Sequence, residues 1–283
     1  MIIEGAFFKL PELLIESPTP DQQYESTLVN HLAMAVLLEF GARSIQQPMN
    51  RVHIERPYPT PPGVKSPARA DLYVNLDGLI PSLQQSEYAR YGLKTSNWLE
   101  AKLFARIGSR SGTQTKVSNT GSIALDLLRL CLYVPENTIG GARDNNRYFL
   151  SVFDRQPAQY LAFTRQSTTS PTRKWLETLM TPGDHRFTIS FHEEPKSFRS
   201  VCKSQGMIKA EPLLAEFRVV TIQFGPLDPE AGQSFCGYLS RIVGFDIQAG
   251  ESRLYLEDTI KETWVQAEDD LQRSLVDRFL SSA

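Results

Sequence analysis

Two short stretches, Arg69-Ala70-Asp71-Leu72-Tyr73-Val74 and Ser96-Asn97-Trp98-Leu99-Glu100-Ala101-Lys102-Leu103-Phe104, decide how the rest of the sequence is interpreted. The alternation of apolar and polar residues in each stretch predicts a short strand. Successive side chains of an extended chain point to opposite faces, so Glu100 and Lys102 share one face of their strand. Charged side chains are rarely buried without a partner or a metal ion, because desolvation is costly. The pattern therefore indicates a chemical role for these charges.

An Asp on one strand and a Glu-x-Lys on the next resembles the PD-(D/E)XK nuclease superfamily, which includes restriction endonucleases, recombination nucleases and archaeal junction resolvases. Asp71 matches the first acidic position, Glu100 the second and Lys102 the lysine, while Ala70 stands where the family often has proline. The resemblance covers roughly residues 20 to 154. It implies an α/β fold with a restriction-endonuclease-like core, in which helices flank a central mixed sheet.

The resemblance also implies a cofactor and a reaction. Mg2+, for which Mn2+ can substitute, is expected between Asp71 and Glu100, with the backbone carbonyl of Ala101 as a further ligand. Lys102 is expected to orient the attacking water or to stabilise the charged phosphate of a phosphodiester during its hydrolysis.

A helix is predicted before these strands. Thr19 and Pro20 supply an N-cap and a first helical residue, and the apolar pattern continues to about Phe40. Glu25 heads the apolar stripe at spacings of three, four, seven and eleven residues, so its carboxylate is expected to point inward beyond the first turn. In the nuclease superfamily a Glu on this helix often joins the metal site. The alternatives are a salt bridge between Glu25 and a nearby base, or a solvent-facing position at the rim.

Further elements complete the expected core. Residues 50 to 56 predict a first strand, a second helix is expected from Thr120 or Ser122 to Tyr133, and residues 147 to 153 predict another strand. The resulting order is a helix, three strands, a helix and a strand. This order is the one that the resemblance implies.

Charge is unevenly distributed along the chain. The formal net charge is -2, yet residues 43 to 129 carry twelve bases and six acids, an excess of six positive charges. Such a segment can form a basic face for nucleic acid on a nearly neutral protein. Arg106, Arg110 and Lys116 fall in a basic stretch without acids, which is expected to be a loop that clamps phosphate, and Arg69 is expected to join them in binding nucleic acid.

The C-terminal half carries fewer functional signals. Residues 186 to 192 and 215 to 224 predict strands, residues 234 to 243 a helix, and an apolar stripe from Ile260 to Phe279 a final helix. No clear linker is present. Residues 1 to 155 are therefore interpreted as a nuclease core with an N-terminal extension, and residues 156 to 283 as an extension or lobe that completes the sheet and serves recognition or dimerisation.

Several other classes of protein lack support. The four histidines and three cysteines show no metal-ligand spacing, and no phosphate-loop motif or Gly-x-Ser-x-Gly elbow occurs. The sequence contains neither a signal-peptide pattern nor a run of about 20 apolar residues. A cytoplasmic protein without a membrane partner is therefore expected.

Two functions are compatible with these features. The first is a Mg2+-dependent DNA endonuclease of restriction or phage-defence type, expected to act as a homodimer because cutting both strands calls for two sites, with a partner subunit in a defence or repair system as an option. The second is a non-catalytic nucleic-acid-binding or assembly subunit on the same fold. The intact set of Asp71, Glu100 and Lys102 favours the first.

Overall fold

The fold is described from a computed structural model. It describes residues 2–16, 25–59, 68–77, 94–105, 113–134, 138–139, 142–143, 145–164, 173–204, 213–225, 235–250 and 252–257. Within these ranges, no helix has the length and apolar character needed to span a bilayer.

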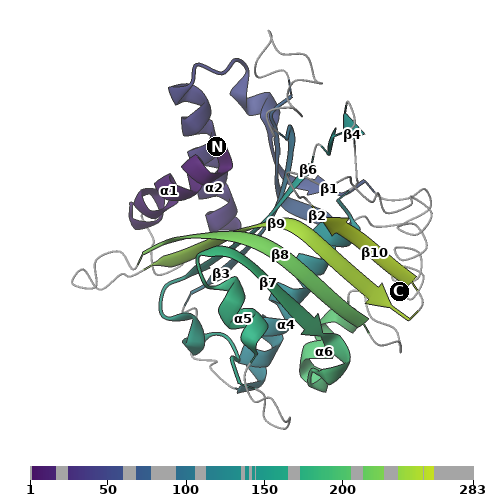
Figure 1. Cartoon of the computed structure of the whole chain (residues 1–283). Helices are drawn as coiled ribbons and strands as arrows, with labels where there is room; N and C mark the ends of the chain where they lie inside the picture. The colour runs from purple at the N-terminus through teal and green to yellow at the C-terminus, as the bar shows by residue number, and fades with distance from the viewer. Residues whose placement is uncertain are drawn as a thin grey trace.

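Eight strands form one mixed sheet at the centre of the molecule (Figure 1). In spatial order they are β1 (Val52–Pro57), β2 (Arg69–Asn75), β3 (Ser96–Phe104), β6 (Asn145–Phe153), β9 (Cys236–Ala249), β8 (Leu213–Phe224) and β7 (Gly183–Ser190), with β10 (Ser252–Glu257) also paired to β9. The β3–β6 pair is parallel and the other pairs are antiparallel. Together with the helices on its faces, this sheet confirms the predicted α/β architecture.

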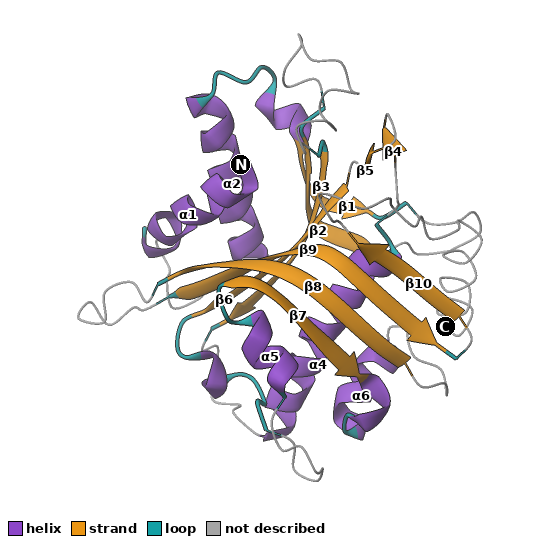
Figure 2. Ribbon diagram, viewed as in Figure 1, coloured by secondary structure: helices purple, strands orange, loops and turns teal. Residues whose placement is uncertain are grey.

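Helices cover both faces of the sheet (Figure 2). On one face, α1 (Ile2–Ile15) and α2 (Glu25–Ala42) bury a core that includes Phe7, Phe40 and Leu99. On the other face lie α4 (Thr113–Leu132), α5 (Lys174–Leu179) and α6 (Lys196–Ser204), whose core includes Leu128 and Phe149. Because β3 lies between α2 and α4, side chains from three layers can meet around it.

Short elements connect these layers. They are the 3-10 helices η2 (Pro48–Arg51), η3 (Pro157–Gln159) and η4 (Phe191–Glu193), and the small hairpin of β4 (Thr138–Ile139) and β5 (Ala142–Arg143). The described chain therefore runs as α2, β1, β2, β3, α4 and β6 through the segment that carries the motif, apart from these short connections. This is the predicted order of a helix, three strands, a helix and a strand.

The helix predicted for residues 234 to 243 is wrong. Residues 236 to 243 belong to β9, which pairs with β8 along most of its length, and Ser234 lies outside the described residues. On its other edge, β9 pairs first with β6 and then with β10. Leu239 packs into the core beneath α1 and α2, and Tyr238 and Ile242 pack into the opposite core. A strand buried on both faces lacks polar alternation, so its apolar spacing resembled that of a helix.

The remaining predicted elements have different outcomes. The strands expected near residues 50, 147, 186 and 215 correspond to β1, β6, β7 and β8 with shifted ends. The second helix begins at Thr113 rather than at Thr120 or Ser122. The final helix expected from Ile260 to Phe279 lies outside the described residues.

Candidate functional site

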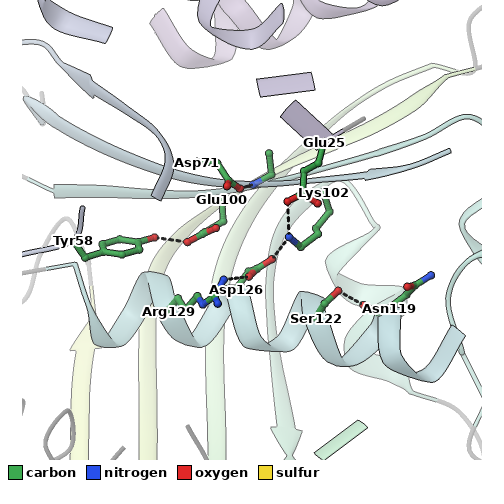
Figure 3. Close-up of polar contacts among 10 residues, drawn as sticks. Glu25, Tyr58, Asp71, Glu100, Lys102, Asn119, Ser122, Asp126 and Arg129 are labelled. Atoms are coloured by element: carbon green, nitrogen blue, oxygen red, sulfur yellow. Dashed lines mark hydrogen bonds and ion pairs between the residues drawn. The ribbon is translucent and has the colours of Figure 1, made fainter. Parts of the chain in front are cut away.

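The β2–β3 pairing brings the two motif acids together. Leu72 pairs with Leu99, so Asp71 and Glu100 occupy the next pair of positions in the same antiparallel register. Side chains at directly opposite positions have Cβ atoms roughly 5 Å apart. Asp71 is tied to β3, because its Oδ2 accepts a hydrogen bond of 2.7 Å from the Ala101 N–H. Figure 3 shows the resulting cluster.

Lys102 connects the three layers of the fold. Its Nζ lies 3.0 Å from Glu25 Oε1 at the start of α2 and 3.2 Å from Asp126 Oδ2 on α4 (Figure 3). The Lys102 side chain is only 17% exposed, so few alternative positions are open to its ammonium group. The lysine of the motif is therefore held between two carboxylates.

Asp126 was not predicted as a site residue. Its side chain is 1% exposed, and its Oδ1 also accepts a hydrogen bond of 3.1 Å from Arg129. The sequence did contain a signal, because Asp126 falls between Ile123 and Leu127 within the apolar stripe of a predicted helix. What the sequence could not show is that this stripe faces the strand of Glu100 and Lys102.

Tyr58 is a second residue that sequence reasoning missed. It follows β1 at the edge of a proline-rich stretch, and the structure buries it completely against Trp98 with ring centroids 5.3 Å apart. Its hydroxyl donates a hydrogen bond of 2.7 Å to Glu100 Oε1. Glu100 itself is 1% exposed. Tyr58 therefore fixes the orientation of the most buried motif acid.

The cluster has more acids than bases. It holds four carboxyl groups and two cations. If all six groups were ionised, the net charge of the cluster would be two minus four, that is -2. The acids are Glu25, Asp71, Glu100 and Asp126, and the cations are Lys102 and Arg129. Burial raises the pKa of Asp71 to about 6. Burial, with the charges of Asp126 and Asp71, also raises the pKa of Glu100 well above its usual range.

Lys102 is nevertheless charged. Burial raises the pKa of Asp126, although Lys102 and Arg129 oppose this shift. For Lys102, burial alone would lower the pKa, but the charges of Asp126, Glu25 and Asp71 outweigh it and raise the pKa above its usual value. The ammonium group therefore stays protonated throughout the physiological pH range.

The acids of this cluster fit a hard divalent cation. Asp71 and Glu100 offer carboxylate oxygens, and a charge of +2 would restore electrical balance. Within the described ranges, no three His, Cys, Asp or Glu side chains are grouped closely enough to cage a metal by themselves. A full cage is not required, because Mg2+ is usually held by one or two carboxylates together with waters and substrate oxygens. The Ala101 N–H donates a hydrogen bond to Asp71. The metal ligand that the resemblance implies is the Ala101 carbonyl, and this stays a prediction.

Glu25 is only partly buried. It is the first described residue of α2, and its side chain is 43% exposed. The predicted helix start at Thr19 and Pro20 lies outside the described residues. The Glu25 carboxylate forms a salt bridge with Lys102, the alternative that the sequence left open, and its part in a metal site stays a prediction.

Two of the four residues predicted to bind nucleic acid lie in the described chain, on different elements. Arg69 begins β2, is exposed, and lies 3.7 Å from Glu55 Oε2. Lys116 lies in α4 and not in the predicted loop, because that helix begins three residues earlier. Its Nζ donates a hydrogen bond of 2.8 Å to the Ala158 carbonyl. Arg106 and Arg110 lie outside the described residues.

Comparisons with known proteins add no assignment. No protein-family model matches the chain, and neither a curated protein nor a solved structure matches it. The interpretation of the site therefore depends on its own residues and contacts.

Proposed function

We propose that the protein is a Mg2+-dependent nuclease that hydrolyses DNA phosphodiester bonds, with a restriction-endonuclease-like core of the PD-(D/E)XK type. The observation that carries this proposal is the convergence of Asp71, Glu100 and Lys102 in one buried cluster that holds four carboxyl groups and two cations. A restriction or phage-defence endonuclease is the form that we favour.

The arrangement around the cluster supports the same proposal. The motif strands β2 and β3 are antiparallel neighbours, β3 runs parallel to β6, and α2 and α4 pack on opposite faces. This combination agrees with the core that the resemblance implies. Fold alone does not define activity, so the argument for catalysis depends on the cluster.

The residues of the cluster have distinct chemical tasks in this proposal. Asp71 and Glu100 would hold Mg2+, which when bound would activate a water and neutralise charge on the phosphate. Lys102, kept protonated by its acidic neighbours, would orient that water or donate to the phosphate oxygens as negative charge develops. Asp126 and Tyr58 would position Lys102 and Glu100 through the contacts described above.

Cleavage of both DNA strands suggests a homodimer, because each active site cuts one strand. This oligomeric state belongs to the proposal, as does any partner subunit in a defence or repair system. Sedimentation of the protein with and without DNA would test it.

A non-catalytic nucleic-acid-binding or assembly subunit is the second candidate. One observation favours it: the Lys102 ammonium is already paired with Glu25 and Asp126, and Glu100 and Asp71 accept hydrogen bonds from protein donors. An inactive relative of a nuclease could keep such a network for stability.

Plasmid nicking distinguishes the two candidates. Supercoiled DNA is incubated with the parent protein, Asp71→Ala and Lys102→Ala, each with Mg2+, with Mn2+ and with EDTA. We expect metal-dependent nicking by the parent, and a rate lower by roughly a hundredfold or more for Lys102→Ala, as when a charge-stabilising donor is lost.

Matched controls come from α5, where Lys174→Ala and Glu177→Ala remove exposed charges of the same kinds. Both should nick DNA at the parent rate. Equal nicking by the parent, Asp71→Ala and Lys102→Ala would reject the catalytic assignment, and absence of nicking by the parent with either metal would favour the binding subunit.

A further inference from the structure

A cationic and aromatic surface lies beside the carboxylate cluster. On β1 and β2, His53 pairs with Tyr73 and Arg56 pairs with Ala70. Tyr73 is two residues beyond Asp71 in the same strand, so the two side chains point to the same face about 7 Å apart along the strand. We call His53, Arg56 and Tyr73 the β1–β2 platform.

Ring contacts join this platform to the cluster. The Arg56 guanidinium lies over the Tyr73 ring, 5.4 Å from its centroid, and the His53 ring is 5.8 Å from the same ring. Tyr73 in turn contacts Trp98 at 4.5 Å between centroids. Trp98 packs on Tyr58, which donates to Glu100. A continuous row of side chains therefore leads from the surface to the motif acids.

The position of Arg56 suits contact with a ligand. Arg56 is exposed, and its ring contact with Tyr73 restricts the orientation of its guanidinium group. An arginine held in this way can bind a phosphate with two hydrogen bonds at a reduced entropic cost. Nearby Arg69 lies 3.7 Å from Glu55, and both side chains are more than half exposed, so this ion pair is weak.

Among the described helices, α2 packs on β1 and β2 from the opposite face. The main strand contacts of α4 are with β3 and β6. The cluster itself has an excess of carboxylates, which would repel a polyanion. A strand that brings its phosphate to Asp71 and Glu100 therefore needs cations immediately beside them, and the platform supplies such a group.

We infer that the β1–β2 platform binds the phosphodiester backbone of the substrate strand next to the position where the strand is cut. Arg56 contacts a phosphate, Tyr73 holds Arg56 in place, and His53 lies beside them along the path of the substrate strand. This inference rests on the proposed function, because it names the substrate contact of that same site.

Binding measurements with Ca2+ in place of Mg2+, to suppress cleavage, test the inference. Fluorescence anisotropy is recorded for a labelled single-stranded DNA, its duplex and an RNA of the same sequence at several salt concentrations. We expect Arg56→Gln to weaken binding roughly tenfold and to reduce the slope of log affinity against log salt by about one, as for loss of one phosphate contact. Tyr73→Leu should give a similar loss, whereas Tyr73→Phe, which keeps the ring, should bind as the parent does.

A matched control exists on β10. Arg253 lies over the Tyr255 ring at 5.6 Å, in the same type of contact but remote along the sheet from Asp71. Arg253→Gln and Tyr255→Leu should leave binding unchanged. Thermal unfolding of each variant identifies those that fail to fold, and the exposed Arg56→Gln decides the outcome if Tyr73→Leu is one of them.

The outcomes separate this inference from the proposed function. If Arg56→Gln binds as the parent does, or if Arg253→Gln loses as much affinity as Arg56→Gln, the inference is rejected even if the parent nicks plasmid. Absence of binding by the parent to all three nucleic acids also overturns it. Binding that depends on Arg56 in a protein that never nicks DNA supports the platform and rejects the nuclease. The preferred nucleic acid in this series identifies the substrate class.

Discussion

Two buried ionic groups of this protein differ in their charge balance. The side chains of Arg173 and Glu194 are both 0% exposed, and Arg173 Nε and Nη2 lie 3.0 and 2.9 Å from Glu194 Oε2. Arg173 Nη1 donates hydrogen bonds to the carbonyls of Ala162 and Thr164. One cation thus meets one anion. In the Lys102 cluster, by contrast, four carboxyl groups surround two cations.

This difference separates structural from functional burial of charge. A buried ion pair with matched charges connects segments of the fold without a surplus of either charge. A buried cluster with surplus carboxylates destabilises the protein unless the acids take up protons or a cation binds. Burial raises the pKa of Asp71 and Glu100, and the neighbouring carboxylates add to both shifts.

The largest expected effect on stability belongs to the balanced pair. Arg173→Met leaves Glu194 buried without its cation, so the free energy of unfolding should fall by about 3–5 kcal/mol. Glu100→Gln removes a surplus charge while keeping an oxygen that can accept from Tyr58, so stability at neutral pH should stay unchanged or rise. Urea unfolding of the metal-free proteins measures both. A loss of stability in Glu100→Gln as large as that in Arg173→Met would show that the Lys102 cluster is as structural as the Arg173–Glu194 pair.

A smaller effect is expected for the residue that orients Lys102. Asp126→Asn keeps the shape of the side chain but weakens its hold on the ammonium group. The maximal nicking rate should fall by roughly tenfold, as for other supporting residues, while the substrate concentration at half-maximal rate stays the same. The matched control is Asp184→Asn, which changes an exposed acid paired with Arg218. Its nicking rate should equal that of the parent. An increase in the half-maximal concentration alone would instead assign Asp126 to substrate binding.

The motif strands were predictable because their signal is local. Alternation in the sequence placed Glu100 and Lys102 on one face, and the register of β2 against β3 brought Asp71 beside them. Asp126 and Tyr58 could not be assigned in this way. Their role depends on the packing of α4 and of the segment after β1 against the sheet, which no local pattern specifies.

Burial on both faces explains the main error in the fold. In β9 the residues from Cys236 to Val243 are mostly apolar, and the spacing of Tyr238, Leu239 and Ile242 is also compatible with one side of a helix. Only the neighbouring strands β6 and β8 show that this segment is extended. Glu25 illustrates a similar limit, because its spacing from Leu28 and Leu32 did not specify that it is 43% exposed and paired with Lys102.

Calorimetric titration of the protein with Mn2+ at pH 6 and pH 8 tests the central claim most directly. If the cluster is a cation site, Mn2+ must displace protons from acids whose pKa is raised, among them Asp71 with a pKa of about 6. Affinity should therefore increase as the pH rises through 6, and the heat at pH 6 should depend on the ionisation enthalpy of the buffer. Glu100→Gln should lose most of the binding. An absence of Mn2+ binding by the parent, or equal binding by Glu100→Gln, would contradict the account.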